Sequence, residues 1–307
     1  MTHEQYLKNL QPPKGMVDVI LDTDTFNEVD DQFAVALTLR SPEKINMLGF
    51  TVAPFFNSNS TSPEDGMEKS YDEMMRLLTL DGREDMKKNV YRGARIYLPD
   101  EKTPVESDAA DFIAETAKKY SPEKPLYVVA IGAGTNVASA ILKAPEAMRE
   151  NTVIVWLSGH AREWPDTAEF NMRQDVAAAR VIFGCGAPVV QLPCMGVVSA
   201  FTTTKYELEH WLKEKNPLAD YLYHFVTDEM DKYVPDLAWS RCIWDVTAIG
   251  WLLNDGNRFM KSYLATSPIV QYDNHYSFDP ARHQICYVYH IKRDQLFTEL
   301  YKKLSGD

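Results

Sequence analysis

The stretch Asp22-Thr23-Asp24-Thr25-Phe26-Asn27-Glu28-Val29-Asp30-Asp31 decides how the rest of this sequence is interpreted. It places five carboxylates within ten residues, and no Lys or Arg lies between Lys14 and Arg40 to neutralise them. The apolar run Met16–Leu21 before it predicts a buried strand, and the apolar spacing of Asp31–Arg40 after it predicts a helix. Open α/β sheets bind ligands at such strand-to-helix junctions, so we expect a functional site here.

The acidic stretch predicts a divalent metal site. Carboxylates this close together repel one another and raise each other's pKa unless a cation lies between them. Hard oxygen ligands in this number suit Ca²⁺ or Mg²⁺. Helix capping by Asp30 or Asp31 accounts for one or two of the acids but not for five. An EF-hand loop is excluded, because Phe26 and Asn27 stand where it needs Asp or Asn and then Gly.

The composition is that of a globular protein, with 307 residues, 45% hydrophobic and 25% charged. Lys and Arg total 32 against 44 Asp and Glu, and the resulting charge of −12 argues against nucleic acid or an anionic membrane surface as a partner. Residues 1–15 are polar and unlike a signal peptide, and no apolar run approaches the roughly 20 residues of a membrane span. The four cysteines lack C-x-x-C spacing, so neither a zinc site nor a redox pair is supported. We therefore expect a soluble, cytoplasmic protein.

Strand-like and helix-like segments alternate along most of the chain. This alternation predicts an α/β fold in a single domain over residues 1–307, with a mainly parallel twisted sheet, a Rossmann-like core and helices on both faces. The later segments are expected to be a helical region at Tyr206–Tyr233, a helix at Trp244–Leu253, edge strands at Ile269–Tyr272 and Ile285–Ile291, and a last helix at Arg293–Leu304.

Two families share the acidic pattern. Asp22-Thr23-Asp24-Thr25 resembles the start of haloacid-dehalogenase-like phosphatases, in which Asp22 would be the phosphorylated nucleophile beside Mg²⁺. Such an enzyme needs a later acidic pair in a Gly-Asp-x-x-x-Asp setting, and no segment after a strand supplies one. The whole run, with Asp-Thr-Asp, a short loop, Asp-Asp and an apolar helix, more strongly resembles the inosine-uridine nucleoside hydrolase family. The family has three residues between the second Asp and the Asp pair, whereas this chain has five.

The resemblance to nucleoside hydrolases recurs at four later places. Val128–Asn136 resembles a strand-Gly-x-x-Thr-Asn turn, in which the carbonyl at the position of Ile131 binds Ca²⁺. Glu169-Phe170-Asn171 matches a hallmark whose Glu and Asn hydrogen-bond ribose. Asn57 matches the ribose-contacting Asn after the second strand, and Asp245 matches the last Ca²⁺ carboxylate. Taken singly, these residues also fit a tight turn, surface or turn positions, and a helix N-cap.

Trp244 bears on the choice of base. Many pyrimidine-cleaving or nonspecific members have His at this position as an acid for the leaving base, whereas purine-specific members resemble this chain in having Trp. An indole face favours offset stacking with a purine, although core packing of Trp244 is the alternative. The resemblance thus implies Ca²⁺-dependent hydrolysis of the N-glycosidic bond of ribonucleosides, with purines favoured, through an oxocarbenium-like transition state.

The resemblance also implies roles for individual residues. Asp24 is the expected general base and a metal ligand, with Asp31, Asp245 and the Ile131 carbonyl as the other protein ligands. Contacts to the nucleoside are expected from Asp30, Asn57, Glu169, Asn171 and Trp244. Supporting positions around them are assigned to Asp22, Glu28 and His160. The family implies a homo-oligomer, either a dimer or a tetramer. A non-catalytic Ca²⁺-dependent ribose-binding protein remains an alternative, because the loop is longer and the His is missing.

Overall fold

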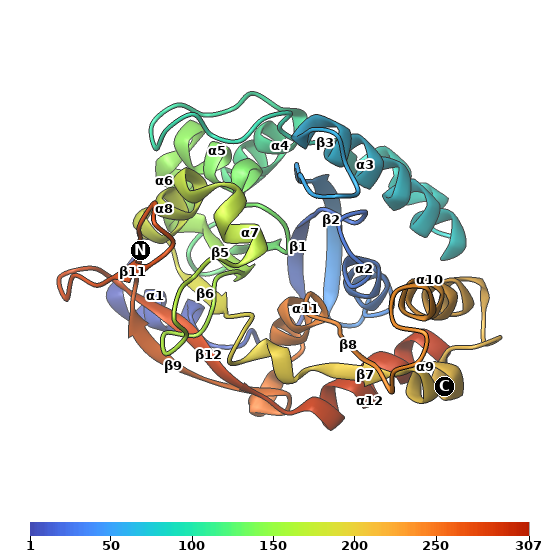
Figure 1. The fold of residues 1–307 in the computed structure, drawn as a ribbon. Coiled ribbons are helices and arrows are strands. Elements are labelled where there is room, and N and C mark those ends of the chain that lie inside the picture. Colours follow the sequence, from blue (N-terminus) through green and yellow to red (C-terminus); the bar gives the residue numbers. More distant parts are fainter. Residues whose placement is uncertain (307) are drawn as a thin grey trace.

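An eight-stranded sheet forms the centre of the molecule (Figure 1). The computed structural model describes residues 1–306. Across the sheet the strands lie in the order β3 (Val90–Arg92), β2 (Ile45–Val52), β1 (Val17–Thr23), β4 (Leu126–Ala130), β5 (Thr152–Leu157), β6 (Val189–Leu192), β12 (Gln284–Ile291) and β9 (Met260–Thr266). Every neighbouring pair is parallel except β12 and β9. The prediction of an α/β fold with a mainly parallel sheet is confirmed.

Helices cover both faces of this sheet (Figure 1). One face carries α4 (Asp108–Ala117), α5 (Thr135–Lys143), α6 (Pro145–Asn151) and α8 (Val176–Gly184). The other face carries α2 (Asp31–Leu39), α3 (Pro63–Leu80), α9 (Lys205–Trp211), α10 (Pro217–Tyr233), α11 (Val246–Leu252) and α12 (Arg293–Ser305). Successive side chains of a strand point to opposite faces. Accordingly, Val19 and Leu21 of β1 join the apolar core on one side, and Ile20 joins the core on the other.

The remaining elements are short. They are α1 (His3–Asn9), α7 (Phe170–Gln174), the 3-10 helices η1 (Glu84–Asn89), η2 (Val198–Ala200) and η3 (Asp255–Asn257), and two small antiparallel pairs, β7 (Thr202–Thr204) with β8 (Ser240–Cys242) and β10 (Ile269–Val270) with β11 (Tyr276–Ser277). All four cysteines are free. Among residues 1–306, no helix is both long enough and apolar enough to cross a membrane.

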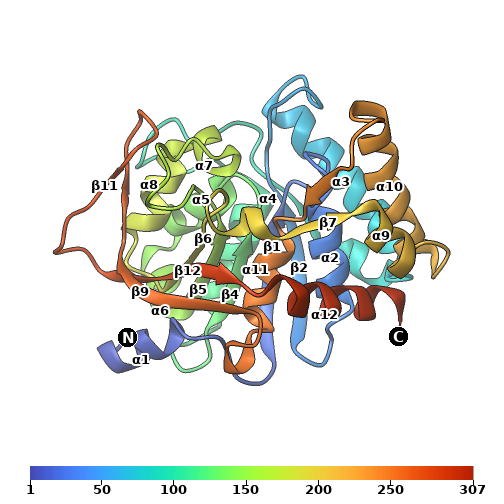
Figure 2. The same cartoon turned by 60° about the horizontal axis from the view of Figure 1, so that its bottom comes forward.

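Three expectations for the later part of the chain were wrong or incomplete. Ile285–Ile291 is not an edge strand, because β12 lies between β6 and the outermost strand β9, which its sequence does not reveal (Figure 2). Ile269–Tyr272 lies outside the main sheet, since β10 pairs only with β11. The helical region Tyr206–Tyr233 is divided into α9 and α10. Asn216 caps α10 by accepting a hydrogen bond from the Ala219 N–H, and Pro217 fits its first turn because it needs no amide partner there.

The carboxyl ends of the central strands place the predicted motifs next to one another. β1 pairs with β2 on one side and β4 on the other, and β4 pairs with β5. Asp24 follows the end of β1, Ile131 follows β4, and the loop that leads to Glu169 follows β5. Because parallel strands end at the same edge of a sheet, one edge collects residues that are far apart in the sequence.

Candidate active site

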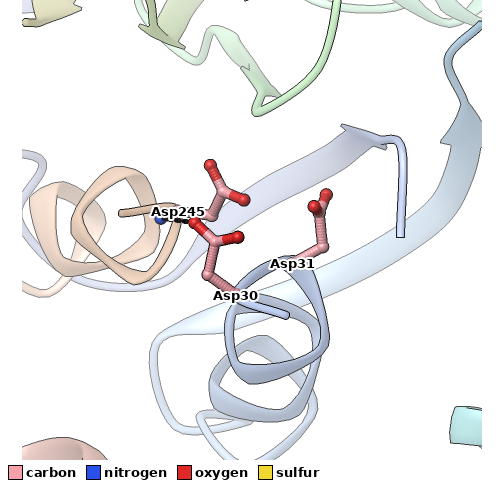
Figure 3. Close-up of side chains that lie close together, drawn as sticks. All are labelled: Asp30, Asp31 and Asp245. Carbon is pink, nitrogen blue, oxygen red and sulfur yellow. Dashed lines mark hydrogen bonds between the residues drawn. The ribbon is translucent and has the colours of Figure 1, made fainter. Parts of the chain in front are cut away.

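Three buried carboxylates converge where two helices begin (Figure 3). Asp30 and Asp31 lie at the start of α2, and Asp245 lies at the N-cap of α11. One carboxylate oxygen from each residue lies within 4.8 Å of the others. Neither Asp30 nor Asp245 caps its own helix with its side chain, and the Asp245 N–H instead donates to Asp30 Oδ2 at 3.3 Å. The side chains are therefore available to a shared partner.

The electrostatics of this cluster favour a cation. Burial raises the pKa of Asp30 to about 8, and the charges of Glu28 and Asp31 add to the effect. Burial also raises the pKa of Asp31 to about 6. The pKa of Asp245 lies well above its usual range, because of burial and then the neighbouring Asp30, Asp31 and Asp24. Helix N-termini stabilise negative charge only modestly, so three carboxylates here call for a cation between them.

Asp24 and Asp22 lie beneath this cluster, and both are fully buried. The Asp24 carboxylate packs against the turn after β4, where a Cβ on Gly132 would lie only 3.0 Å from its Cγ. Burial and the charge of Asp31 hold the pKa of Asp24 well above its usual range. Asp22 Oδ1 accepts hydrogen bonds from Thr51 Oγ1 at 2.6 Å and from Asn136 Nδ2 at 2.8 Å. Burial raises the pKa of Asp22 to about 7.

Several carboxylate oxygens of these residues are buried without a hydrogen-bond partner, which indicates whether a metal ion would fit among them. Within the described chain, Asp22 Oδ2, both oxygens of Asp24 and Asp31 Oδ2 are buried without a hydrogen-bond partner. The other oxygen of Asp31 accepts from Thr23 Oγ1 at 2.5 Å and from the Asp24 N–H at 3.2 Å, which fixes its orientation. A buried charged oxygen without a partner is costly. A set of hard oxygen ligands therefore fits Ca²⁺ or Mg²⁺ well.

Glu169 and Asn171 line the same pocket as Asp30 and Asp245, and hydrogen bonds fix both side chains. The Glu169 carboxylate is the cap of α7 and accepts from the N–H groups of Asn171, Met172 and Gly159 at 2.8–2.9 Å. The Asn171 amide Nδ2 donates to the Ile131 carbonyl at 2.9 Å and to the Leu157 carbonyl at 3.1 Å. Glu169 thus orients Asn171, and Asn171 orients the carbonyl that the family resemblance assigns to the metal.

A cleft of about 560 Å³ opens above these groups. It is lined by Asn27, Glu28, Asp30, Ile131, Leu157, His160, Glu169, Phe170, Asn171, Cys194, Met195, Trp244 and Asp245. Eight of the twelve predicted site residues are in this lining. The other four, Asp22, Asp24, Asp31 and Asn57, are not.

Trp244 and His160 are the two side chains of the lining that bear on the choice of leaving base. Trp244 is half-buried, lines the cleft and also packs against the core that includes α2 and α11. The structure is therefore compatible both with stacking on a base and with core packing as the role of Trp244. His160 Nδ1 accepts from the Met195 N–H at 3.3 Å, which places a neutral ring's proton on Nε2. Burial lowers the pKa of His160, which favours that neutral form.

The lengthened loop between Asp24 and Asp30 is held from three sides. Ser70 of α3 accepts from Thr25 Oγ1 at its carbonyl, at 2.8 Å, and from the Phe26 N–H at its Oγ, at 3.3 Å. Asn57 Nδ2 donates to the Asn27 side-chain oxygen at 2.6 Å, so Asn57 reaches the cleft only through Asn27. The third contact comes from β8, where Arg241 Nη2 donates to Glu28 Oε2 at 2.8 Å.

Sequence reasoning missed Arg241, Ser70 and the role of Asn136. Asn136 lies in the quoted Thr-Asn turn, and its bond to Asp22 could have been suspected from that motif. Arg241 lies 213 residues from Glu28, and no local pattern in the sequence connects the two. The absence of basic residues near the acidic stretch is therefore compensated from a distant segment.

Known proteins resemble this chain over most of its length. A family model described as inosine-uridine preferring nucleoside hydrolase matches residues 19–277. A pyrimidine-specific ribonucleoside hydrolase, RihA, from Citrobacter koseri is 28% identical over 249 residues, which are 73% of this chain and 76% of RihA. An uncharacterized Schizosaccharomyces pombe protein is 28% identical over 200 residues, but the match covers only 57% of this chain and 60% of that protein.

A solved structure shares the fold. The purine-preferring ribonucleoside hydrolase from Gardnerella vaginalis superposes with a TM-score of 0.75 at 21% identity, covering 94% of this chain and 98% of that one. The family model spans far more than half of the chain and includes the acidic stretch, the turn after β4 and the Glu169–Asn171 segment. This chain therefore belongs to the inosine-uridine preferring nucleoside hydrolase family, the N-ribosyl hydrolases that act on ribonucleosides.

Proposed function

We propose that this protein hydrolyses purine ribonucleosides to ribose and free base, with Ca²⁺ held by the buried carboxylates beneath the cleft. The observation that carries this proposal is the set of buried carboxylate oxygens without a hydrogen-bond partner, which includes Asp31 Oδ2 in the cluster with Asp30 and Asp245, the two carboxylates of that cluster that line the cleft. Family membership removes the phosphatase alternative. It leaves the choice of base open, since its relatives include both a pyrimidine-specific and a purine-preferring enzyme.

The proposed ligands are the carboxylates of Asp24, Asp31 and Asp245 and the carbonyl of Ile131. Asp30 belongs to the same cluster and is proposed to hold a ribose hydroxyl from beside the metal. When bound, Ca²⁺ would hold the ribose diol and a water molecule and make that water easier to deprotonate.

The protein's own groups supply the remaining steps. Asp24 is proposed as the general base, because both of its oxygens are buried without a hydrogen-bond partner next to the proposed metal ligand Asp31. Asn171 is proposed to contact the ribose from an orientation that Glu169 fixes. Asn57 does not line the cleft; it would act by holding the side chain of Asn27, which does. Such preorganisation holds the sugar for attack at C1′.

Trp244 supports the assignment of a purine as the leaving base. Its indole lines the cleft next to Asp245, and Phe170 adds a second aromatic side chain to the lining. Offset stacking on such rings is stronger for a two-ring base than for a one-ring base, because more ring area is covered. His160 also lines the cleft, and its lowered pKa leaves the ring neutral, without the extra proton that a general acid would donate.

The test is a panel of purine and pyrimidine nucleosides assayed for free ribose, with Ca²⁺ and after chelation with dialysis. We expect purines to be hydrolysed only with Ca²⁺. We expect Asp24→Asn to lose roughly 10²–10⁴ in kcat with the fold intact by circular dichroism. Full activity after chelation would refute the metal assignment, and a preference for pyrimidines would refute the purine assignment. Ca²⁺-dependent binding without ribose release would indicate a binding protein instead.

We also propose that the chain acts as a homo-oligomer of single-domain subunits spanning residues 1–307. The family resemblance supports a dimer or a tetramer. Multi-angle light scattering measures the mass directly, and a value near the monomer mass of 35.0 kDa would refute this part.

A further inference from the structure

The cleft is more acidic than metal binding alone requires. Its lining contains the carboxylates of Glu28, Asp30, Glu169 and Asp245, and no Lys or Arg is among the described residues that line it. Asp22, Asp24 and Asp31 add three more carboxyl groups directly beneath. These seven carboxyl groups outnumber the three positive charges that a divalent cation and Arg241 bring. A substrate entering the loaded cleft therefore meets a negative potential.

Of the carboxyl groups that line the cleft, Glu28 is the one that the family pattern does not include. It lies in the loop that is two residues longer than the family pattern, and its side chain is 41% exposed at the cleft. Arg241 contacts Glu28 at 2.8 Å and Glu229 at 3.9 Å, but Arg241 is not part of the lining. The guanidinium therefore holds Glu28 in place, and Glu28 is the member of this ion pair that lines the cleft.

Apart from the carboxyl groups assigned to the metal and the ribose, the lining offers no group that readily protonates a departing base. Trp244 occupies the position at which many pyrimidine-cleaving or nonspecific relatives have His. The lowered pKa of His160 keeps that ring neutral, and a neutral imidazole is a poor proton donor. The Cys194 thiol has a pKa raised by burial, and Glu169 next to it raises the pKa further. A base that needs no proton in order to leave suits this cleft best.

We propose that, besides purine ribosides, this cleft hydrolyses the riboside of a cationic nitrogen heterocycle, whose ring nitrogen bonded to C1′ carries the positive charge, and does so more readily than it hydrolyses a neutral riboside that also leaves without a proton. This inference rests on the proposed function. Glu28 attracts the cationic ring at the mouth of the cleft, and the Trp244 and Phe170 rings contact it by cation–π interaction.

The bond changes balance without an acid. As the bond from C1′ to the ring nitrogen breaks, its electron pair stays on the nitrogen, and the heterocycle leaves as a neutral molecule. The oxygen of water forms the new bond to C1′, and its proton passes to the Asp24 carboxylate. A neutral purine riboside would in contrast release an anion unless a proton were supplied.

The experiment compares two ribosides that both leave without protonation. Nicotinamide riboside carries the charged ring, and 4-nitrophenyl riboside is neutral. The Ca²⁺-loaded enzyme is assayed with both at low salt and in about 0.3 M NaCl, which screens charges beyond a few ångströms. We expect kcat/KM for the cation to exceed that of the neutral substrate about tenfold, and salt to reduce this ratio several-fold.

Two glutamate variants test whether the preference for the cationic riboside depends on Glu28. Glu28→Gln is expected to lower the cation-to-neutral ratio of kcat/KM about fivefold, because a nearby negative charge is lost. Glu229→Gln is the matched control, since Glu229 also faces Arg241 but does not line the cleft, and the ratio should stay unchanged. The salt series on the unaltered enzyme gives an independent answer if Glu28→Gln does not fold.

The outcomes separate this inference from the function on which it rests. Hydrolysis of 4-nitrophenyl riboside with a ratio near one, or a ratio that neither salt nor Glu28→Gln changes, would overturn the inference and leave the hydrolase function standing. No Ca²⁺-dependent hydrolysis of either riboside would overturn both.

Discussion

Removing the metal should make the stability of this protein fall as the pH rises from about 5 to about 7. The cause is the set of buried carboxyl groups, of which Asp22 is the simplest case. Its neighbours Thr51 and Asn136 are neutral, and burial raises its pKa from 3.8 to about 7. The folded protein then keeps a proton on Asp22 in a pH range where the unfolded chain has already released it. Folding at a higher pH must therefore either take up a proton from solution or bury the charged carboxylate.

The size of the effect follows from linkage. Between the two pKa values, the folded state binds one more proton than the unfolded state, so each pH unit lowers the unfolding free energy by roughly 1.4 kcal/mol. Over the two units from about pH 5 to about pH 7, Asp22 alone accounts for roughly 3 kcal/mol. That is a large part of the roughly 5–15 kcal/mol that stabilises a typical domain. Asp31 and Asp30, with pKa values of about 6 and 8, add to the slope in the same direction.

The assay is urea unfolding with EGTA at several pH values, repeated with Ca²⁺. We expect Ca²⁺ to add more stability near pH 7 than near pH 5, because its ligands must be deprotonated. Asp22→Asn keeps an oxygen acceptor for Thr51 and Asn136 but cannot ionise, so its slope in EGTA should be shallower by about 1 kcal/mol per pH unit. A metal-free stability that is flat or rises over this range would refute the reasoning. So would an Asp22→Asn slope equal to that of the natural sequence.

Three further outcomes test the geometry of the site. Asp245→Asn should weaken Ca²⁺ affinity at least about tenfold in titration calorimetry, and unchanged affinity would remove Asp245 from the ligand set. Gly132→Ala places a methyl group against the Asp24 carboxyl, so kcat should fall while KM changes little; unchanged kcat would show that the turn gives way freely. Trp244→Ala should lower kcat/KM for inosine by roughly tenfold but hardly affect 4-nitrophenyl riboside, whereas equal losses would show that Trp244 only packs in the core.

Much of the fold could be predicted from local patterns. The strand predicted at Met16–Leu21 is β1, Val17–Thr23, because a buried parallel strand is a short apolar run between turns. The helix predicted at Asp31–Arg40 is α2, Asp31–Leu39. The order of β9 and β12 at the far edge could not be predicted. Three of the seven side chains of β9 are exposed and only two are buried, so β9 has neither a continuous apolar run nor a regular alternation.

The sequence motifs predicted which segments form the candidate site, but not how their side chains are oriented. The acidic stretch, Ile131, Glu169–Asn171 and Asp245 each follow a strand or begin a helix, and the sheet brings them together. The orientation of the side chains was not accessible from the same patterns. Asn57 contacts the acidic loop instead of lining the cleft, and the carboxylate of Glu169 is already occupied by three backbone N–H groups. Such details depend on which donors from other segments lie within reach.

The attachment of the longer acidic loop limits how this enzyme can be recombined with its relatives. Ser70 and Arg241 hold the loop from α3 and β8, which are separate segments of the chain. A chimaera that received only residues 24–31 would bring in Glu28 without its basic partner and Thr25 without its acceptor. Its two extra residues would then lack a defined conformation, and Asp30 would lose its fixed position at the start of α2. The loop therefore has to be exchanged together with α3, the segment around Asn57 and β8.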